Sequence, residues 1–205
     1  MKIVAIILVL ILIVIAAVLI LSPKAPENVE SLQVNNATST EESHNEDKDA
    51  EGIHANIELT DFSFVGYGPG KSHVGKFEKY EVKEVHVNDG GIPVGGELVI
   101  QTNSVKTDTS MLDTHLCEKE NFFNCAKYPE IKFSLSNVTE MSEGTYQVSG
   151  NLTVKDVTKN VAFSVKANMD KTFSSEFKLK MSDFGFTAPG IVDDEVLVKF
   201  SGKLI

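Results

Sequence analysis

The sequence contains no arginine and no tryptophan, and only two cysteines among 205 residues. All 19 basic residues are therefore lysines, and 29 acidic residues bring the formal net charge to −10. Without guanidinium groups the chain cannot hold phosphate groups in the bidentate manner of arginine. The acidic excess also repels polyanions, so we expect no nucleic acid partner.

Motifs of catalysis and metal binding are also absent from the sequence. There is no Gly-x-Ser-x-Gly elbow, no phosphate-binding loop and no His-Glu-x-x-His sequence. His73 and His86 have no second metal ligand at a useful spacing, which favours strand-surface or turn positions for both. We therefore expect a protein that is not an enzyme, with no cofactor and no metal.

A long apolar run is present at the amino terminus, where Ile3 to Leu21 contain no polar or charged residue. A helix of that length spans about 28 Å, close to the thickness of the bilayer hydrocarbon. The apolar region of a cleaved signal peptide, the alternative, is usually shorter. Residues 1–22 are predicted to be a single-pass transmembrane signal anchor. Lys2 on its amino-terminal side predicts that the remaining chain lies outside the cytoplasm, either periplasmic or extracellular.

Residues 23–52 are rich in Ser, Asn, Thr, Glu and Asp and offer little to bury. This composition predicts a disordered acidic linker. The folded domain is then expected over residues 53–205.

Apolar and polar residues alternate throughout that domain, as in the segment Tyr146–Val154. Period-two alternation predicts strands with one apolar face, and the short turns between them predict antiparallel hairpins. About eight strands are expected, beginning near residues 54, 74, 96, 130, 145, 160, 174 and 194. Closure into a barrel would remove the exposed edges of such a sheet, and a two-sheet sandwich is the alternative.

One segment departs from the alternation, and it carries both cysteines. Leu112, His115 and Leu116 have helical spacing, and Asp108 or Thr109 precedes them as a helix cap. Eight positions along one helix would separate Cys117 from Cys125 by roughly 12 Å, whereas a disulfide tolerates about 7 Å between Cα atoms. A bond therefore requires the chain to double back. The spacing favours such a structural disulfide over a metal or redox site.

The same segment resembles the one that marks the YceI-like family, in which His-Leu is followed by a Phe-Phe pair and then by Lys-Tyr-Pro. Four further motifs agree with that family in order. They are GPGKSHVGKF at residues 68–77, NSVKTD at 103–108, YQVSGNLTVKDVTKNV at 146–161 and SDFGF at 182–186. The resemblance covers nearly all of residues 53–205. The arginine that often precedes the late Asp-Phe-Gly is missing here, so contact with an anionic head group is not carried over.

The resemblance implies an all-β fold, a lipocalin-like eight-stranded antiparallel barrel with a short helix between strands 3 and 4. It also implies a long isoprenoid chain, such as a polyprenyl or quinone tail, as the ligand inside the barrel. The expected ligand-binding residues are Phe122, Phe123, Tyr128, Phe133, Phe163, Phe177, Phe184, Phe186 and His115. The same aromatic side chains would also serve as ordinary core, and His115 as a structural histidine.

Two main functions remain open at this point, beside a weaker third, an enzyme that acts on a lipid head group through His115 or Asp113. The first is a membrane-anchored, extracytoplasmic lipid-binding protein that holds or carries an isoprenoid. The alternative is a surface-exposed interaction module without a lipid ligand. A homodimer is kept as an alternative to a monomer for either function.

Overall fold

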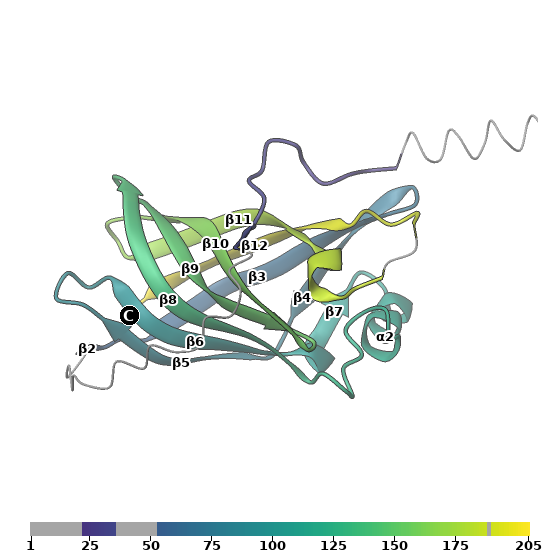
Figure 1. Ribbon diagram of the computed structural model, residues 1–205, viewed down its shortest axis with the longest axis horizontal. Helices are drawn as coiled ribbons and strands as arrows, with labels where there is room; N and C mark the ends of the chain where they lie inside the picture. Colours follow the sequence, from purple (N-terminus) through teal and green to yellow (C-terminus); the bar gives the residue numbers. More distant parts are fainter. Residues whose placement is uncertain (1–21, 36–52, 188–189) are drawn as a thin grey trace, which may run out of the picture.

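The structure is a computed structural model that describes residues 22–35, 53–187 and 190–205 (Figure 1). Within these ranges, twelve strands form one antiparallel sheet that curls around a hollow interior. They are β1 Gln33–Asn35, β2 Ile53–His54, β3 Ile57–Gly68, β4 Lys71–Phe77, β5 Tyr80–Val87, β6 Pro93–Gln101, β7 Val105–Thr107, β8 Glu130–Ser142, β9 Thr145–Val154, β10 Val157–Ala167, β11 Thr172–Lys180 and β12 Glu195–Leu204.

The prediction of a closed eight-stranded barrel is wrong. The hydrogen-bonded order is β2-β5-β6-β8-β9-β10-β11-β12-β3-β4-β7, with β1 added to β10, so the sheet has two free ends among the described residues. No ladder joins β3 to β5 within that path, although the Tyr80 hydroxyl donates to the Leu59 carbonyl at 3.1 Å. The sheet is therefore a curled half-barrel.

Eight of the long strands begin within three residues of their predicted positions, but β5 is an additional strand. Its alternation is interrupted at Glu84, where φ is +51° and the pairing with β6 shifts register between Lys83 and His86. Val82 and Val85 both line the interior although they are three positions apart. Because the bulge interrupts the alternation, a period-two pattern does not predict β5.

The predicted short helix is confirmed as α2, Ser110–Glu118, which lies between β7 and β8. The Thr109 hydroxyl accepts a hydrogen bond from the Leu112 backbone N–H at 3.3 Å and so caps its first turn. Figure 1 shows α2 at one end of the curled sheet. The two 3₁₀ turns are η1, Thr102–Ser104, and η2, Met181–Phe184.

Residues 23–35 of the predicted linker contact the sheet in the structure. Ala25 and Val29 pack with Val65, Tyr67 and Leu197 on the outside of β3 and β12. Residues 33–35 form β1, and Leu32 beside them is buried. The rest of that linker, residues 36–52, and the predicted anchor up to residue 21 lie outside the described residues. Among the residues that are described, no helix has the length and apolar character needed to cross a membrane.

Candidate functional site: an aromatic-walled cavity

The curled sheet encloses a cavity of about 720 Å³, within the usual size range of small-molecule sites. Its wall is almost entirely apolar and draws on nearly every long strand and on α2. The predicted ligand-binding residues found in that wall are Phe122, Phe123, Phe133, Phe163, Phe177, Phe184 and Phe186. Their contact with a ligand remains a prediction.

Strand alternation directs Phe133, Phe163 and Phe177 inward, and ring contacts hold them there. On β10, Val161, Phe163 and Val165 line the cavity, with one outward residue between each pair. The Phe163 ring stacks on Phe177 of β11 with centroids 4.9 Å apart, and it meets Phe200 of β12 edge-on at 5.8 Å. Aromatic pairs in these geometries add to the burial of their surfaces.

Glycines in the neighbouring strands explain why the aromatic wall leaves room inside. A Cβ atom at Gly75 would lie 2.2 Å from Cζ of Phe64, its cross-strand partner. A Cβ at Gly202 would lie 2.6 Å from Cζ of Phe173 in the same way. Because these glycines carry no side chain, the rings lie flat on the backbone, as in aromatic rescue of glycine in sheets. The cavity keeps the space that upright rings would occupy.

A second aromatic cluster lies at the end of the sheet beside α2. The Phe123 ring meets Phe77 edge-on at 5.5 Å and Phe186 at 5.3 Å. Leu112 and Leu116 of α2 line the cavity at the same end. The segment after α2 therefore supplies one end of the cavity wall.

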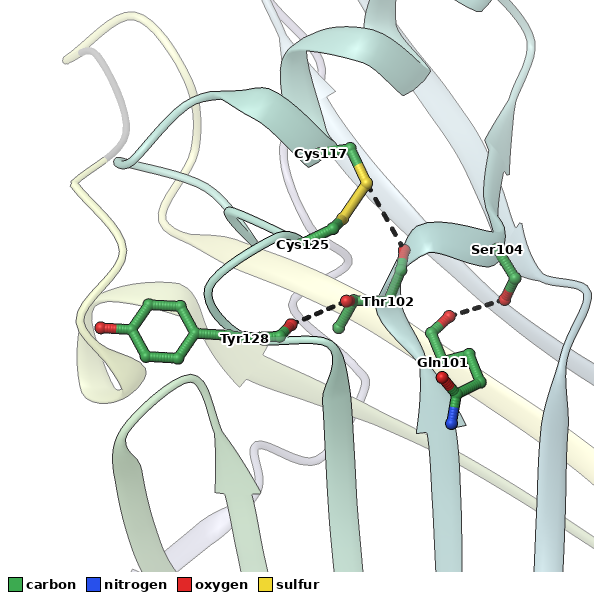
Figure 2. Close-up of a disulfide and its surroundings, with 6 residues drawn as sticks. All are labelled: Gln101, Thr102, Ser104, Cys117, Cys125 and Tyr128. Atoms are coloured by element: carbon green, nitrogen blue, oxygen red, sulfur yellow. Dashed lines mark hydrogen bonds between the residues drawn. A yellow bond between two sulfur atoms is a disulfide. The ribbon is translucent and has the colours of Figure 1, made fainter.

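The two cysteines brace that segment (Figure 2). A disulfide joins Cys117 and Cys125, whose Cα atoms are 4.9 Å apart, and the Cys125 N–H donates to the Cys117 carbonyl at 2.8 Å. The chain doubles back between them and presents Phe122 and Phe123 from the resulting loop. Below the disulfide, the Thr102 hydroxyl donates to the Tyr128 carbonyl at 2.7 Å and fixes the entry into β8.

Tyr128 and His115, also predicted to bind ligand, are not among the cavity-lining residues. The Tyr128 hydroxyl donates to Oδ2 of Asp156 at 3.0 Å, and the ammonium groups of Lys127 and Lys155 lie over its ring. His115 is exposed on α2. Tyr128 precedes β8 rather than lying in it, so strand alternation does not direct it inward.

Polar groups at the cavity wall include His73, for which the sequence alone favours a strand-surface or turn position. Its Nδ1 lies 2.6 Å from Oδ1 of Asp108, and the Lys71 ammonium lies 3.5 Å from Oδ2. The hydrogen bond from His73, followed by the charges of His73 and Lys71, lowers the pKa of Asp108 below its ordinary value. The signal for His73 was its alternation with Gly75 and Phe77, which also face inward.

A partly buried carboxylate, that of Asp113, lies in the first turn of α2 beside β7. Asp113 Oδ1 accepts the Thr107 N–H at 2.6 Å and the Thr107 hydroxyl at 2.8 Å, and the Lys106 ammonium is 3.5 Å from Oδ2. Burial acts to raise the pKa of Asp113, but these hydrogen bonds and the lysine outweigh it and hold the pKa below its ordinary value. In the part of the chain that the structure describes, no cluster of three His, Cys, Asp or Glu residues is arranged to hold a metal ion.

Comparisons with known proteins agree with this architecture. A UPF0312 protein of Shewanella denitrificans is 31% identical over 147 residues, which cover 67% of this chain and 74% of the relative. The crystal structure of Burkholderia cenocepacia BcnA matches with a TM-score of 0.63 and 23% identity, covering 70% of this chain and 94% of BcnA. A polyisoprenoid binding domain from Saccharophagus degradans, implicated in plant cell wall breakdown, matches with a TM-score of 0.54 and 15% identity over 74% of this chain and 98% of that domain.

At these identities the two solved structures establish the fold alone. The family is established by sequence, because the model of the YceI-like domain matches residues 53–204. Our chain belongs to the YceI-like domain family.

Proposed function

We propose that this protein binds an isoprenoid lipid, of the polyprenyl or quinone-tail kind, in the cavity of its curled sheet. The observation that carries the proposal is the cavity of about 720 Å³ with its aromatic and aliphatic wall. Each methylene group that moves from water into such a wall contributes about 0.8 kcal/mol, so a long apolar tail needs few polar contacts. The polyisoprenoid-binding relative of the same fold supports this ligand class.

The proposed role is binding and carriage without catalysis. The support is the composition of the cavity wall, which consists almost entirely of aromatic rings and aliphatic side chains. His73 is the wall residue with a titratable side chain and a carboxylate partner, and it is suited to a hydrogen bond with a hydroxyl or quinone oxygen.

The proposed location is the extracytoplasmic side of a membrane, with the chain attached through its amino-terminal apolar run. The support is the sequence of Ile3–Leu21 together with the positive charge of Lys2. A cysteine pair suited to an oxidising compartment agrees with this location. Formation of a homodimer is a prediction that light scattering of the purified protein would test.

The test is extraction and mass spectrometry of the purified full chain after incubation with solanesol, a long-chain polyprenol. We expect the wild type to retain solanesol in a stoichiometric amount. The change Phe163→Asp places a charge between the Phe177 and Phe200 rings and is expected to abolish retention. A wild-type protein that retains no more solanesol than the Phe163→Asp variant would exclude the proposal and favour the interaction-module alternative.

A further inference from the structure

Strands β10 and β11 are not paired with each other along most of their length. They pair only near their connecting turn, at Lys166 with Ser174 and at Ala167 with Phe173. Beyond these pairs the Ser175 hydroxyl donates to the Ser164 carbonyl at 2.6 Å, and the regular ladder does not continue. We call the gap between residues 160–164 and 175–180 the seam. Two unpaired strand edges in a sheet are costly unless another segment satisfies them.

The chain's own residues 30–35, here called the docked segment, fill the seam (Figure 1). On one side β1 pairs antiparallel with β10, matching Val34 with Val161. On the other side the Leu32 N–H donates to the Lys178 carbonyl at 2.7 Å, and the Lys178 N–H donates to the Glu30 carbonyl at 2.8 Å. The segment thus bonds to both strands that it separates.

Side chains reinforce this docking. The Ser164 hydroxyl donates to Oε2 of Glu30 at 2.8 Å, and the Asn35 side-chain amide donates to the side-chain oxygen of Asn160 at 2.9 Å. The position of the segment is therefore specified at both of its ends.

The docked segment also reaches the cavity. Leu32 is buried, belongs to the main core cluster and lines the cavity, while Val34 packs against the same cluster. Gln33, between them, is exposed. The wall of the cavity is therefore completed by a residue from the segment that precedes the family domain.

Resting on the proposed function, we propose that the docked segment is a part of the lipid site, that Leu32 contacts the bound isoprenoid, and that docking and lipid binding are coupled. A segment held by a three-residue strand and a few hydrogen bonds opens more readily than the long strands around it. Lipid that touches Leu32 stabilises the docked form. By reciprocity, docking must raise the affinity for lipid by the same factor.

The first test uses the full chain in phosphatidylcholine nanodiscs with a polyprenol that carries a benzophenone group. Illumination is expected to give cross-links on the peptide that contains Leu32 as well as on β10 and β11. Cross-links on the peptides of Phe163 and Phe177 with none on the docked segment would overturn this inference and leave the proposed function standing. Cross-links on none of the cavity-lining peptides would instead contradict the proposed function.

The second test measures amide hydrogen exchange of residues 30–35 with and without the same polyprenol. We expect bound polyprenol to slow exchange at least about tenfold in the wild type. Leu32→Ala should abolish the slowing and lower the affinity about tenfold, whereas Gln33→Ala, its exposed neighbour, should preserve both. Unchanged protection of β8 and β9 amides controls for folding. Exchange of residues 30–35 that does not change while polyprenol is cross-linked in the cavity would refute the coupling.

Discussion

Adding one methyl group at Gly75 tests whether flat aromatic rings keep the cavity open. In Gly75→Ala the new Cβ would lie 2.2 Å from Cζ and 2.7 Å from both Cε atoms of Phe64, so the ring must move by about 1.2 Å to reach 3.4 Å. The ring borders the cavity, so it can swing inward. We expect a loss of stability of about 1–2 kcal/mol, the lower part of the range for overpacked cores.

The larger effect should fall on lipid binding, because the displaced ring occupies space that the lipid needs. Each ligand methylene kept out costs about 0.8 kcal/mol, roughly fourfold in affinity. The two measurements are urea unfolding and titration with a fluorescent isoprenoid. Adding Phe64→Leu to Gly75→Ala removes the clashing ring and should restore part of the stability.

Gly66→Ala is the matched control for this prediction. It adds the same methyl group to β3, at a position that lines the cavity, but nothing lies within 4 Å of the added Cβ. Its stability should stay within about 0.5 kcal/mol of the wild type. If Gly75→Ala and Gly66→Ala unfold at the same urea concentration and bind the isoprenoid equally, the reasoning about flat rings is refuted.

Three further predictions concern the Cys117–Cys125 disulfide, the partly buried carboxylate of Asp113 and the cavity wall. Replacing Cys117 and Cys125 by serine should lower the free energy of unfolding by about 2.5 kcal/mol, measured in urea, because the closed loop no longer restricts the unfolded chain. Asp113→Asn should cost about 1 kcal/mol at neutral pH. The wild-type advantage is present above the ordinary carboxyl pKa and should vanish as pH falls through the lowered pKa of Asp113, which a pH series of unfolding midpoints would follow. His115→Ala should leave solanesol retention unchanged, as its exposed position outside the wall requires.

Each of these has an outcome that contradicts it. Free thiols in the non-reduced protein would contradict the disulfide between Cys117 and Cys125. The intact mass of the protein with and without reductant would reveal them. A stability difference between wild type and Asp113→Asn that persists at strongly acidic pH would exclude the carboxylate as its source. A His115→Ala variant that loses solanesol would contradict the placement of His115 outside the ligand site.

The period-two pattern predicted most strands and much of the cavity wall, because alternation alone decides which side of a strand faces inward. Phe133, Phe163 and Phe177 lie within regular strands and were found in this way. Tyr128 lies outside any strand, and there the pattern gives no direction. Tyr128 is accordingly not among the cavity-lining residues, and its contact with a ligand stays a prediction.

Closure of the sheet could not be predicted, because it depends on which strand edges find partners. A bulge at Glu84 hides β5, and the seam between β10 and β11 leaves no trace in the sequence of either strand. The docked segment did carry a signal, since Leu32 and Val34 alternate with Ser31, Gln33 and Asn35. That alternation is only five residues long and lies in a polar stretch, so the composition of residues 23–52 favours a linker over a strand there.

The amino-terminal segment contacts the domain from the first described residues: the Gly70 N–H donates to the Ser22 hydroxyl at 3.5 Å, and the Ala25 N–H donates to Asp193 Oδ2 at 3.2 Å. Residues 22–24 span at most about 11 Å when extended. The proposed membrane attachment through the apolar run that ends at Leu21 would therefore hold the cavity close to the lipid surface. A free linker of thirty residues would instead allow a distance of roughly 30 Å. Release of residues 30–35 alone would leave this distance unchanged, because Ala25 and Val29 would still hold the chain to β3 and β12. Only the further loss of those contacts would lengthen the tether and let the cavity move away from the membrane surface.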